Sequence, residues 1–324
     1  MRPRATRPAR RQQQGAALLL AMIILTLVAT LASSMIWQQW RAISVEAAER
    51  GRAQSSWVLT GALDWAGLIL NEDLKADQRA QKLVDHLGEP WAVPLAEARL
   101  STFLAADQGN NADDGSGPDA FLSGEIADAQ ARYNLNNLVL NSDPKVRAAE
   151  LAVLQKLCES ISVPSSTAQA IASGLQASGE GGEGAALAPQ SVADLAWFGV
   201  DPADLKRLEP FVVLLPEITI VNLNTASREV IAAAGDGVDL ASADRLVQVR
   251  QREPFASVQN AAAQLQVEPA KLARTGVSTN YFLVQGRVRL GDRVLQERSL
   301  VHRTDGIRTV QVLRRERVNL LAGS

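Results

Sequence analysis

The sequence has few of the side chains from which most active sites and metal centres are built. It contains one cysteine, Cys158, and two histidines, His86 and His302, among 324 residues. A single cysteine excludes a disulfide within the chain and a cysteine-based zinc site. We expect Cys158 to be a small buried apolar side chain. Each histidine stands alone among unrelated residues, so we expect both to be surface or half-buried structural residues.

Catalytic sequence motifs are also missing. The chain has no Ser/His/Asp set, Cys/His pair, phosphate-binding loop or HExxH motif. Its net charge of −2 gives no overall field that would attract nucleic acid or an anionic surface. We therefore predict a structural assembly protein and not an enzyme.

Charge is missing altogether from one long segment near the N-terminus. Residues 16–37 are 22 consecutive residues without a charge. As a helix this segment would be roughly 33 Å long, which matches a membrane hydrocarbon core of about 30 Å. A cleavable secretory signal has an apolar core of only ~7–15 residues followed by a small-residue cleavage site. This segment is longer and continues as an amphipathic helix, which predicts a transmembrane anchor.

The flanks of the apolar segment indicate its orientation. Residues 1–11 contain five arginines and no acidic residue. The positive-inside rule places this basic end in the cytoplasm and the C-terminal bulk of the chain across the membrane. Trp37 and Trp40 stand at the far end of the segment, where interfacial aromatic residues are common. The pattern therefore predicts a single-pass protein.

Gly15 lies directly between the basic leader and the apolar segment, although a helix needs no glycine at its start. This arrangement resembles the leader of type IV pilins and type II secretion pseudopilins. In that family a prepilin peptidase cuts after the glycine on the cytoplasmic side of the membrane. The apolar segment then remains as the start of a long helix. The resemblance implies cleavage between Gly15 and Ala16.

Leu20 departs from the common pilin pattern. Most members have glutamate at the fifth position of the mature chain, and here that position is Leu20. A carboxylate inside a membrane costs free energy unless it is paired, and in pilins its partner is thought to be the free amine of a neighbouring subunit. A subunit without it could stand at the tip of a fibre, with nothing above it. The K class of type II secretion minor pseudopilins (the GspK family) shares this absence.

Sequence periodicity predicts the order of elements in the rest of the chain. The anchor helix is expected to continue through residues 57–69, and short strands are expected within 91–138. Residues 144–275 have helical spacing, with Asp143 as N-cap of the first helix. Alternation within 280–318 predicts three antiparallel strands. The fold class is therefore α+β, with a long N-terminal transmembrane and pilin-type helix packed on an antiparallel sheet and a large inserted all-α domain.

Two internal motifs extend the resemblance to the K class. GEIADAQARYNLN, residues 124–136, matches a G-x-I-x-D-x-x-x-x-[FY]-N-L-N pattern that precedes the inserted domain in that class. IVNLNTA, residues 220–226, contains an [IV]-N-[LV]-N-T-A pattern found late in the insertion. With the leader, these motifs lie at the start, the middle and the last third of the chain. The sequence is therefore identified as a member of the K class.

The resemblance implies a division of the chain and a function. The expected segments are a basic leader (1–15), a transmembrane and pilin-type helix (16–75), the first part of an α/β pseudopilin domain (76–140), an inserted α-domain (141–277) and C-terminal strands that complete the sheet (278–324). The implied function is to initiate, as a minor pseudopilin at the tip, the type II secretion pseudopilus that exports folded proteins across the outer membrane.

The same resemblance implies partners and a location. The implied partners are other minor pseudopilins of the I and J classes in a tip complex, and the prepilin peptidase. The implied location is the inner membrane, with the C-terminal domain in the periplasm. Two other functions stay open: a type IV pilus minor pilin, and a membrane-tethered DNA-binding protein.

Calcium is the cofactor that the sequence leaves open. An EF-hand register starting at Asn110 places Phe121 where the bidentate carboxylate belongs, so this loop is not an EF-hand. The K class is associated with calcium in its α-domain, but the corresponding segment here has only two glutamates, and a solvated loop is the alternative. The candidate oxygen ligands in the two loops are Asp107, Asp113, Asp114, Glu180 and Glu183.

Residues 222–275 also resemble a helix-hairpin-helix DNA-binding module. Such a module needs a surplus of positive charge, but this segment has six basic and six acidic residues. Asp236 and Asp239 stand in the hairpin itself, where phosphate would approach. We therefore expect no nucleic-acid partner. The polar side chains that we expect to cap a helix instead are Asn222, Thr225 and Ser227.

Overall fold

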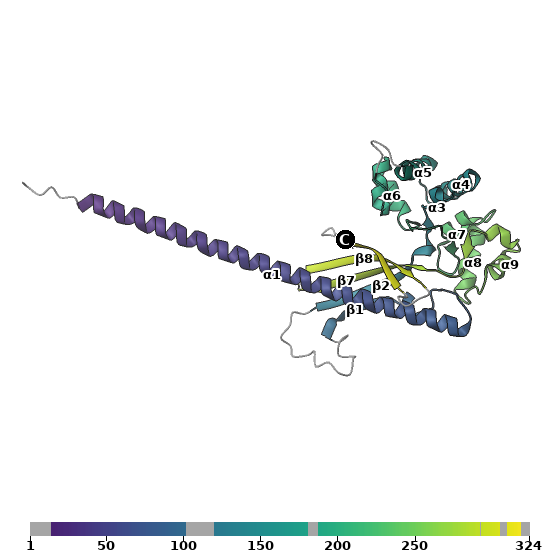
Figure 1. The fold of residues 1–324 in the computed structure, drawn as a ribbon, viewed down its shortest axis with the longest axis horizontal. Helices are drawn as coiled ribbons and strands as arrows, with labels where there is room; N and C mark the ends of the chain where they lie inside the picture. Colours follow the sequence, from purple (N-terminus) through teal and green to yellow (C-terminus); the bar gives the residue numbers. More distant parts are fainter. Residues whose placement is uncertain (1–13, 102–119, 181–186, 292, 305–309, 319–324) are drawn as a thin grey trace, which may run out of the picture. The chain divides into compact units, whose positions relative to one another are not determined.

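The computed structural model in Figure 1 describes residues 14–101, 120–180, 187–291, 293–304 and 310–318. The chain divides into two compact units, residues 1–56 and residues 57–324. One helix, α1 (Gln14–Ala80), supplies all the described residues of the first unit and the beginning of the second.

The first unit is helical throughout its described residues. Its large apolar side chains are exposed, with Leu20 at 60% and Leu25 at 70% of full exposure. The most apolar 18-residue window of α1 has a mean hydropathy of 2.5, and none of that window is buried within the protein. By length and composition, this helix can cross a membrane.

In the second unit, the C-terminal part of α1 packs on an antiparallel sheet. Leu63 and Leu70 of the helix are buried in one cluster with Trp91, Phe282 and Val301. On the strand that contains Phe282, Gly286 permits close approach, since an added Cβ would lie 2.8 Å from the Leu59 side chain.

Helix α1 continues through residues 57–69, as the sequence pattern indicated, and ends beyond the boundary expected for the pilin-type segment. The helix was expected to end near residue 75, but it continues to Ala80. Gln81 then adopts a left-handed backbone conformation with φ of 55°, and the Lys82 N–H donates to the Asp77 carbonyl at 3.0 Å. Four of the five residues from 76 to 80 are good helix formers, namely Ala76, Gln78, Arg79 and Ala80. The helix therefore continues through this polar stretch.

The sheet has five strands in the order β1-β2-β7-β8-β9, with every neighbouring pair antiparallel (Figure 1). The strands are β1 (Leu95–Arg99), β2 (Ala120–Asp128), β7 (Tyr281–Leu290), β8 (Arg293–Arg303) and β9 (Val310–Val318). The three predicted C-terminal strands are therefore confirmed. Since β2 pairs directly with β7, the residues between them form an insertion into the sheet domain.

The insertion is mostly helical. Its α-helices are α3 (Asn137–Leu140), α4 (Pro144–Ser160), α5 (Ser165–Glu180), α6 (Pro202–Leu208), α7 (Arg228–Ala234), α8 (Leu240–Arg250) and α9 (Val258–Leu265). Short 3-10 helices are η2 (Ala129–Ala131), η3 (Val192–Phe198) and η4 (Pro269–Leu272), and η1 (Pro90–Ala92) precedes β1. The predicted fold class is confirmed.

Four very short strands add detail that the sequence pattern did not predict. They form two parallel pairs, β3 (Tyr133–Asn134) with β4 (Val212–Val213), and β5 (Val221–Asn222) with β6 (Thr275–Gly276). Two residues are too few to establish a period, which explains why they were missed.

Local predictions for single residues in this unit are confirmed. Asp143 caps α4 by accepting a hydrogen bond from the Lys145 N–H at 2.8 Å. Cys158 is fully buried, and burial raises the pKa of its thiol to about 11. His86 and His302 are both half-buried.

Candidate functional site

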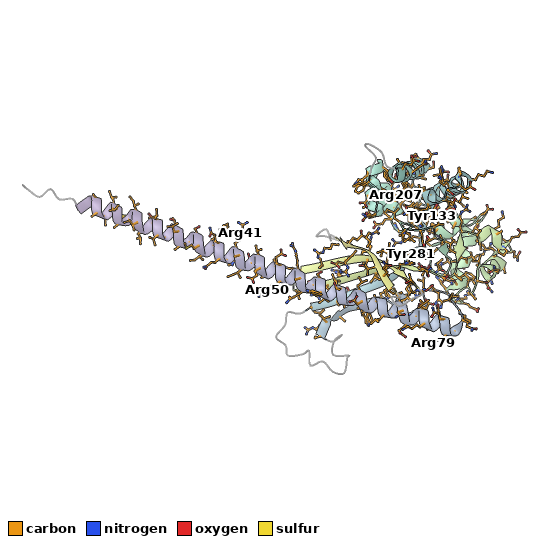
Figure 2. All side chains as sticks on the ribbon, viewed as in Figure 1. Arg41, Arg50, Arg79, Tyr133, Arg207 and Tyr281 are labelled. Carbon is orange, nitrogen blue, oxygen red and sulfur yellow. The ribbon has the colours of Figure 1, made fainter. Side chains whose placement is uncertain are left out.

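The N-terminal end of α1 contains the residues that the sequence singled out for processing and assembly. Gly15, Ala16 and Leu20 all lie within its first two turns. No charged residue occurs from Ala16 to Trp40, and Arg41, labelled in Figure 2, is the first that follows. This end of the helix can therefore make only apolar and small polar contacts.

Two hydroxyl groups within the apolar segment have their hydrogen-bond partners in the helix itself. Thr26 and Thr30 donate to the carbonyls of Ile23 and Leu27, each at 2.9 Å. Backbone and side-chain polar groups inside a bilayer need such internal partners, because no water is present to supply them. The segment is thus suited to contact either lipid or another apolar helix.

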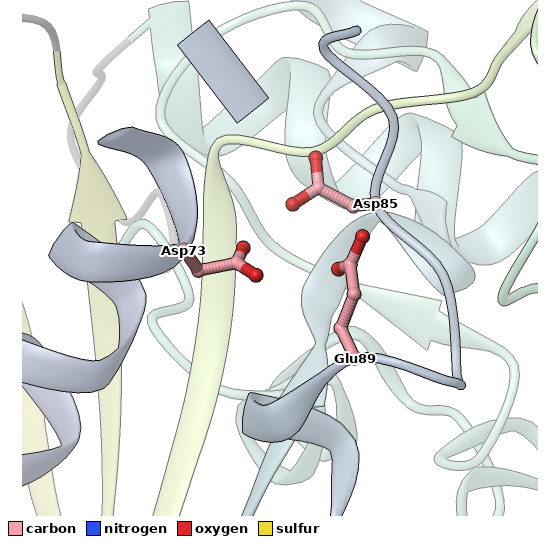
Figure 3. A group of neighbouring side chains, drawn as sticks. All are labelled: Asp73, Asp85 and Glu89. Carbon is pink, nitrogen blue, oxygen red and sulfur yellow. The ribbon is translucent and has the colours of Figure 1, made fainter. Parts of the chain in front are cut away.

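A second group of functional side chains lies at the far end of α1, where three carboxylates point toward one another (Figure 3). They are Asp73 of α1 and Asp85 and Glu89 of the following segment. One carboxylate oxygen from each residue lies within 4.8 Å of those of the other two. Such a group has the donor chemistry of a metal site. The sequence analysis did not identify it.

A guanidinium group occupies this cluster. Arg303, at the end of β8, donates to Asp73 Oδ2 at 3.0 Å and to Asp85 Oδ1 at 2.5 Å. Arg303 and Asp85 are both almost fully buried. The cation that two of the three carboxylates need is therefore supplied by the chain itself, and the cluster is an ion-pair network that joins α1 to the sheet.

Glu89, the third carboxylate, has different partners. One of its oxygens accepts hydrogen bonds from Trp91 Nε1 at 2.5 Å and from the His86 N–H at 3.2 Å. Burial, and then the charge of Asp73, raise the pKa of Glu89 to about 8. At neutral pH this group is mostly protonated, which limits the negative charge in the cluster.

The two internal sequence motifs meet in a second buried network. Asp128, at the end of β2, accepts hydrogen bonds from Asn222 Nδ2 at 2.9 Å and Thr225 Oγ1 at 2.6 Å. Asn222 also donates to the Asp85 carbonyl at 3.0 Å, which links this network to the Arg303 cluster. Burial raises the pKa of Asp128 to about 6. Both motifs therefore hold the insertion on the sheet domain.

This network corrects one prediction about the late motif. Ser227 caps α7 as expected, by accepting from the Val230 N–H at 3.4 Å. Asn222 and Thr225 do not cap a helix, because their side chains bind the buried Asp128 carboxylate. A buried acid needs hydrogen bonds more strongly than an exposed helix end does.

Asn134 of the middle motif and Asn137, which directly follows the motif, also have structural partners. Asn134 donates to the Glu217 carbonyl at 2.7 Å and accepts from the Leu215 N–H at 3.0 Å. Asn137 makes the same pair of contacts with the backbone of Thr219, at 2.8 and 3.1 Å. These hydrogen bonds hold residues 215–219, the segment between β4 and β5, beside the start of the insertion.

The hairpin between α7 and α8 is occupied by a lysine of the same chain. Lys156 Nζ donates to the carbonyls of Gly235 at 3.3 Å and Val238 at 2.8 Å. Asp236, also in the hairpin, pairs with Lys271 at 2.9 Å. The hairpin carbonyls are therefore used for contacts within the chain, and the Asp236 carboxylate stands where a phosphate would have to approach. Both features argue against DNA recognition.

The structure describes only one of the predicted calcium ligands. Asp107, Asp113, Asp114 and Glu183 lie outside the described residues. Glu180 is exposed at the end of α5, and its carboxylate accepts a hydrogen bond from Gln176 at 2.9 Å. This contact lies within a single helix and brings no second ligand to Glu180, so the calcium site stays a prediction.

Comparison with known proteins gives matches to one family. A family profile described as type II secretion system (T2SS), protein K, matches residues 221–280, and a second profile with that description matches residues 131–217. The type II secretion system protein K of Pseudomonas aeruginosa is 29% identical over 308 residues, which cover 88% of this chain and 87% of that protein. The protein K of Pectobacterium carotovorum is 26% identical over 342 residues, with coverage of 95% and 97%.

A solved structure has the same fold. It is the crystal structure of the GspK–GspI–GspJ complex from enterotoxigenic Escherichia coli, one chain of which matches with a TM-score of 0.62 and 20% identity. The match covers 84% of this chain and 99% of that chain. The likeness therefore includes both the sheet domain and the helical insertion.

Proposed function

Because the chain belongs to the type II secretion system protein K family of minor pseudopilins, we propose that it stands at the tip of the type II secretion pseudopilus. There it initiates assembly of the fibre that exports folded proteins across the outer membrane. The observation that carries this proposal is the N-terminal end of α1, which is exposed, apolar and without a carboxylate at position 20.

Maturation is the first step of this proposal. A prepilin peptidase cuts between Gly15 and Ala16, removes the basic leader and leaves a free amine on Ala16. The support is the order of arginines, glycine and apolar helix in the sequence. The remaining helix keeps its full apolar length, because every residue of the membrane segment lies after the cut.

Leu20 is the reason for placing the subunit at the tip. A fibre subunit with glutamate at this position can pair with the amine of a neighbour, whereas a leucine cannot accept such a bond. An unpaired carboxylate within a membrane costs free energy. A subunit with no neighbour above it therefore loses nothing by having leucine, and avoids that cost during insertion.

The membrane segment also suits close packing against other subunits. Small side chains allow helix backbones to approach each other in an apolar environment. The small and short polar residues of this segment are Ala21, Thr26, Ala29, Thr30, Ala32 and Ser33. We propose that the I-class and J-class minor pseudopilins are the partners, a view supported by the similarity to a chain from a GspK–GspI–GspJ complex.

The proposed location is the inner membrane, crossed once, with residues 57–324 in the periplasm. The support is the cluster of arginines before the apolar helix, which favours a cytoplasmic N-terminus. The role is structural rather than catalytic. Its buried charged groups hold the sheet, the helix and the insertion together.

Maturation is tested by co-expression of the full chain with an active or an inactivated prepilin peptidase, followed by N-terminal sequencing. We expect a new N-terminus at Ala16 with the active enzyme alone. An intact chain, or a start at another residue, would contradict the maturation step.

The tip position is tested by complementing a deletion strain with Leu20→Glu and with the matched control Leu20→Ile. At the tip the new carboxylate has no partner, so Leu20→Glu should reduce secretion while Leu20→Ile supports it. A subunit in the interior of the fibre would pair the glutamate instead. Normal secretion with Leu20→Glu would therefore reject the tip position.

A further inference from the structure

Three neighbouring hollows share lining residues: two lie between the insertion and the last strands of the sheet, and the third lies within the insertion, between η3 and α6. They have volumes of about 360, 220 and 250 Å³. Leu214 and Arg314 line both the first and the second, while Val192, Ala193 and Glu209 line both the second and the third. Together they form an elongated depression along η3, which we name the η3 trough.

The middle of the η3 trough is cationic. Its charged lining residues are Arg132, Arg298, Arg314, Arg317, Glu209 and Glu316. Arg298 forms ion pairs with both glutamates, at 3.2 Å from Glu209 and 3.9 Å from Glu316. Arg317 lies 3.3 Å from Glu297. Two arginines, Arg132 and Arg314, remain.

Neither of these two guanidinium groups has an ion pair or hydrogen bond to any residue that the structure describes. Both are only partly accessible to solvent. Burial lowers the pKa of Arg132, and the charge of Arg298 adds to this effect, while Glu209, Glu125 and Asp128 act in the opposite direction. A guanidinium removed from water without a partner costs free energy, which an incoming anion would offset.

Two acids in the neighbourhood of Arg314, Asp194 and Glu316, already have other partners. Asp194 accepts hydrogen bonds from the N–H groups of Gln190 at 3.0 Å and Ser191 at 2.8 Å. Burial raises the pKa of Asp194, but these hydrogen bonds, and to a smaller extent the charge of Arg314, lower it below its ordinary value. Glu316, on the same strand, lies beside Arg298. A carboxylate brought from outside would therefore find two planar donors, Arg132 and Arg314, suited to paired hydrogen bonds.

The two ends of the trough are largely apolar. Pro189, Pro216 and Leu313 line the first hollow, and Ala196 and Pro202 line the third. A free ion would use only the cationic middle. An extended chain with apolar side chains on both sides of an acidic one would fill all three hollows. In addition, β9 is the edge strand of the described sheet, where main-chain groups are open to a passing segment.

We propose that the η3 trough binds an extended segment of another polypeptide in which one or two carboxylates are flanked by apolar side chains. The carboxylates pair with Arg132 and Arg314, and the apolar flanks occupy the outer hollows. This interaction goes beyond the proposed role at the tip and does not involve the N-terminal helix. The trough lies wholly within residues 57–324, so the two proposals can fail independently.

The test measures binding of a labelled nonapeptide by fluorescence anisotropy, using the full chain in detergent micelles. The probe has two central glutamates between leucine and valine flanks, and the matched control peptide has glutamines in their place. We expect the glutamine peptide to bind roughly tenfold more weakly, since charge-assisted hydrogen bonds are the stronger class. Added salt should weaken only the glutamate peptide.

Variants of the chain then locate the site. Arg132→Gln and Arg314→Gln should each weaken the glutamate peptide by roughly tenfold and leave the glutamine peptide nearly unchanged. Arg287→Gln is the matched control, because Arg287 is an exposed arginine of β7 outside the trough. Arg132→Lys keeps the charge and should retain part of the affinity. Circular dichroism and thermal melting identify any variant that fails to fold, in which case Arg314→Gln and Arg132→Lys decide.

Several results would overturn the proposal. One is equal binding of both peptides, or a loss with Arg287→Gln as large as that with Arg314→Gln. Another is no binding of the peptide together with binding of citrate, which would make the trough a site for free oxyanions. A third is self-association of the chain that Arg314→Gln abolishes without any peptide binding, which would make a second copy the occupant.

Discussion

The two parts of α1 have the same backbone conformation but different surroundings. Between Leu18 and Val45 the large apolar side chains are more than half exposed, whereas Leu63 and Leu70 are 6% and 0% exposed. Among the residues that the structure describes, none buries the large apolar side chains of the first part. The second part is stabilised by the sheet beneath it. One helix thus serves two purposes that can be separated by mutation.

The largest expected effect follows from replacing residues 16–40 with an unrelated single-pass anchor of equal length. Secretion should fall to the level of a deletion strain, because the contacts with other subunits are lost. The melting temperature should not change, because no core residue is altered. Normal secretion with the foreign anchor would show that the first part of α1 is only a tether.

The next effect concerns the ion-pair network at the end of α1. Arg303→Met should lower the free energy of unfolding by about 3–5 kcal/mol, because Asp85 and Asp73 would be left buried without a cation. Arg79→Met, at an exposed position in the last turn of the helix, should change it by less than about 0.5 kcal/mol. Chemical denaturation of the full chain in detergent measures both. Equal effects would mean that the network contributes nothing.

A matched pair of leucines sharpens the contrast within the helix. Leu70→Ala removes a fully buried side chain and should cost about 2–5 kcal/mol of unfolding free energy. Leu27→Ala removes an exposed side chain of the first part and should leave that free energy unchanged within about 0.5 kcal/mol. Should Leu27→Ala prove as destabilising as Leu70→Ala, the first part would have a core of its own.

The smallest effect depends on pH. The pKa of Glu89 is raised from 4.5 to about 8 by burial, so between these values the folded state retains a proton that the unfolded chain has released. The free energy of unfolding should therefore fall as the pH rises through this window. Glu89→Gln keeps an acceptor for Trp91, removes the titration and should gain on the order of 2 kcal/mol at pH 9 with little change at pH 5.

Exposed Glu253 provides the control for this prediction. The variant Glu253→Gln should not change the pH dependence measured by denaturation across the same window. If Glu89→Gln leaves the slope as steep as in the unaltered chain, the proton is bound elsewhere.

Features with a local sequence signal were predicted well. The strands β7, β8 and β9 follow from alternation of apolar and polar residues, and the start of α4 follows from an aspartate before a proline. The resemblance to a family pointed to both internal motifs, and the leader stays a prediction. It did not reveal what the motif residues do, and the assignment of Asn222 and Thr225 as helix caps was wrong.

Features made by residues far apart in the chain were missed. The Arg303 cluster joins Asp73 to a residue 230 positions away. Lys156 binds the Gly235 carbonyl in a hairpin 79 positions later. Arg132, at the start of the insertion, and Arg314, in the last strand, line one hollow. No sequence periodicity relates such residues. The distances between their side chains are set only when the sheet, α1 and the insertion pack together.

The sequence alone determined that this protein has an apolar N-terminal helix, a helical insertion and three C-terminal strands. The signals for these elements, hydrophobic periodicity and helix capping, depend on residues only a few positions apart. Only the tertiary structure decided which charges are paired, which motif residues are buried and where two arginines have no partner among the described residues. Those outcomes depend on desolvation and on distances between distant segments, which are fixed when the sheet, the helix and the insertion pack together.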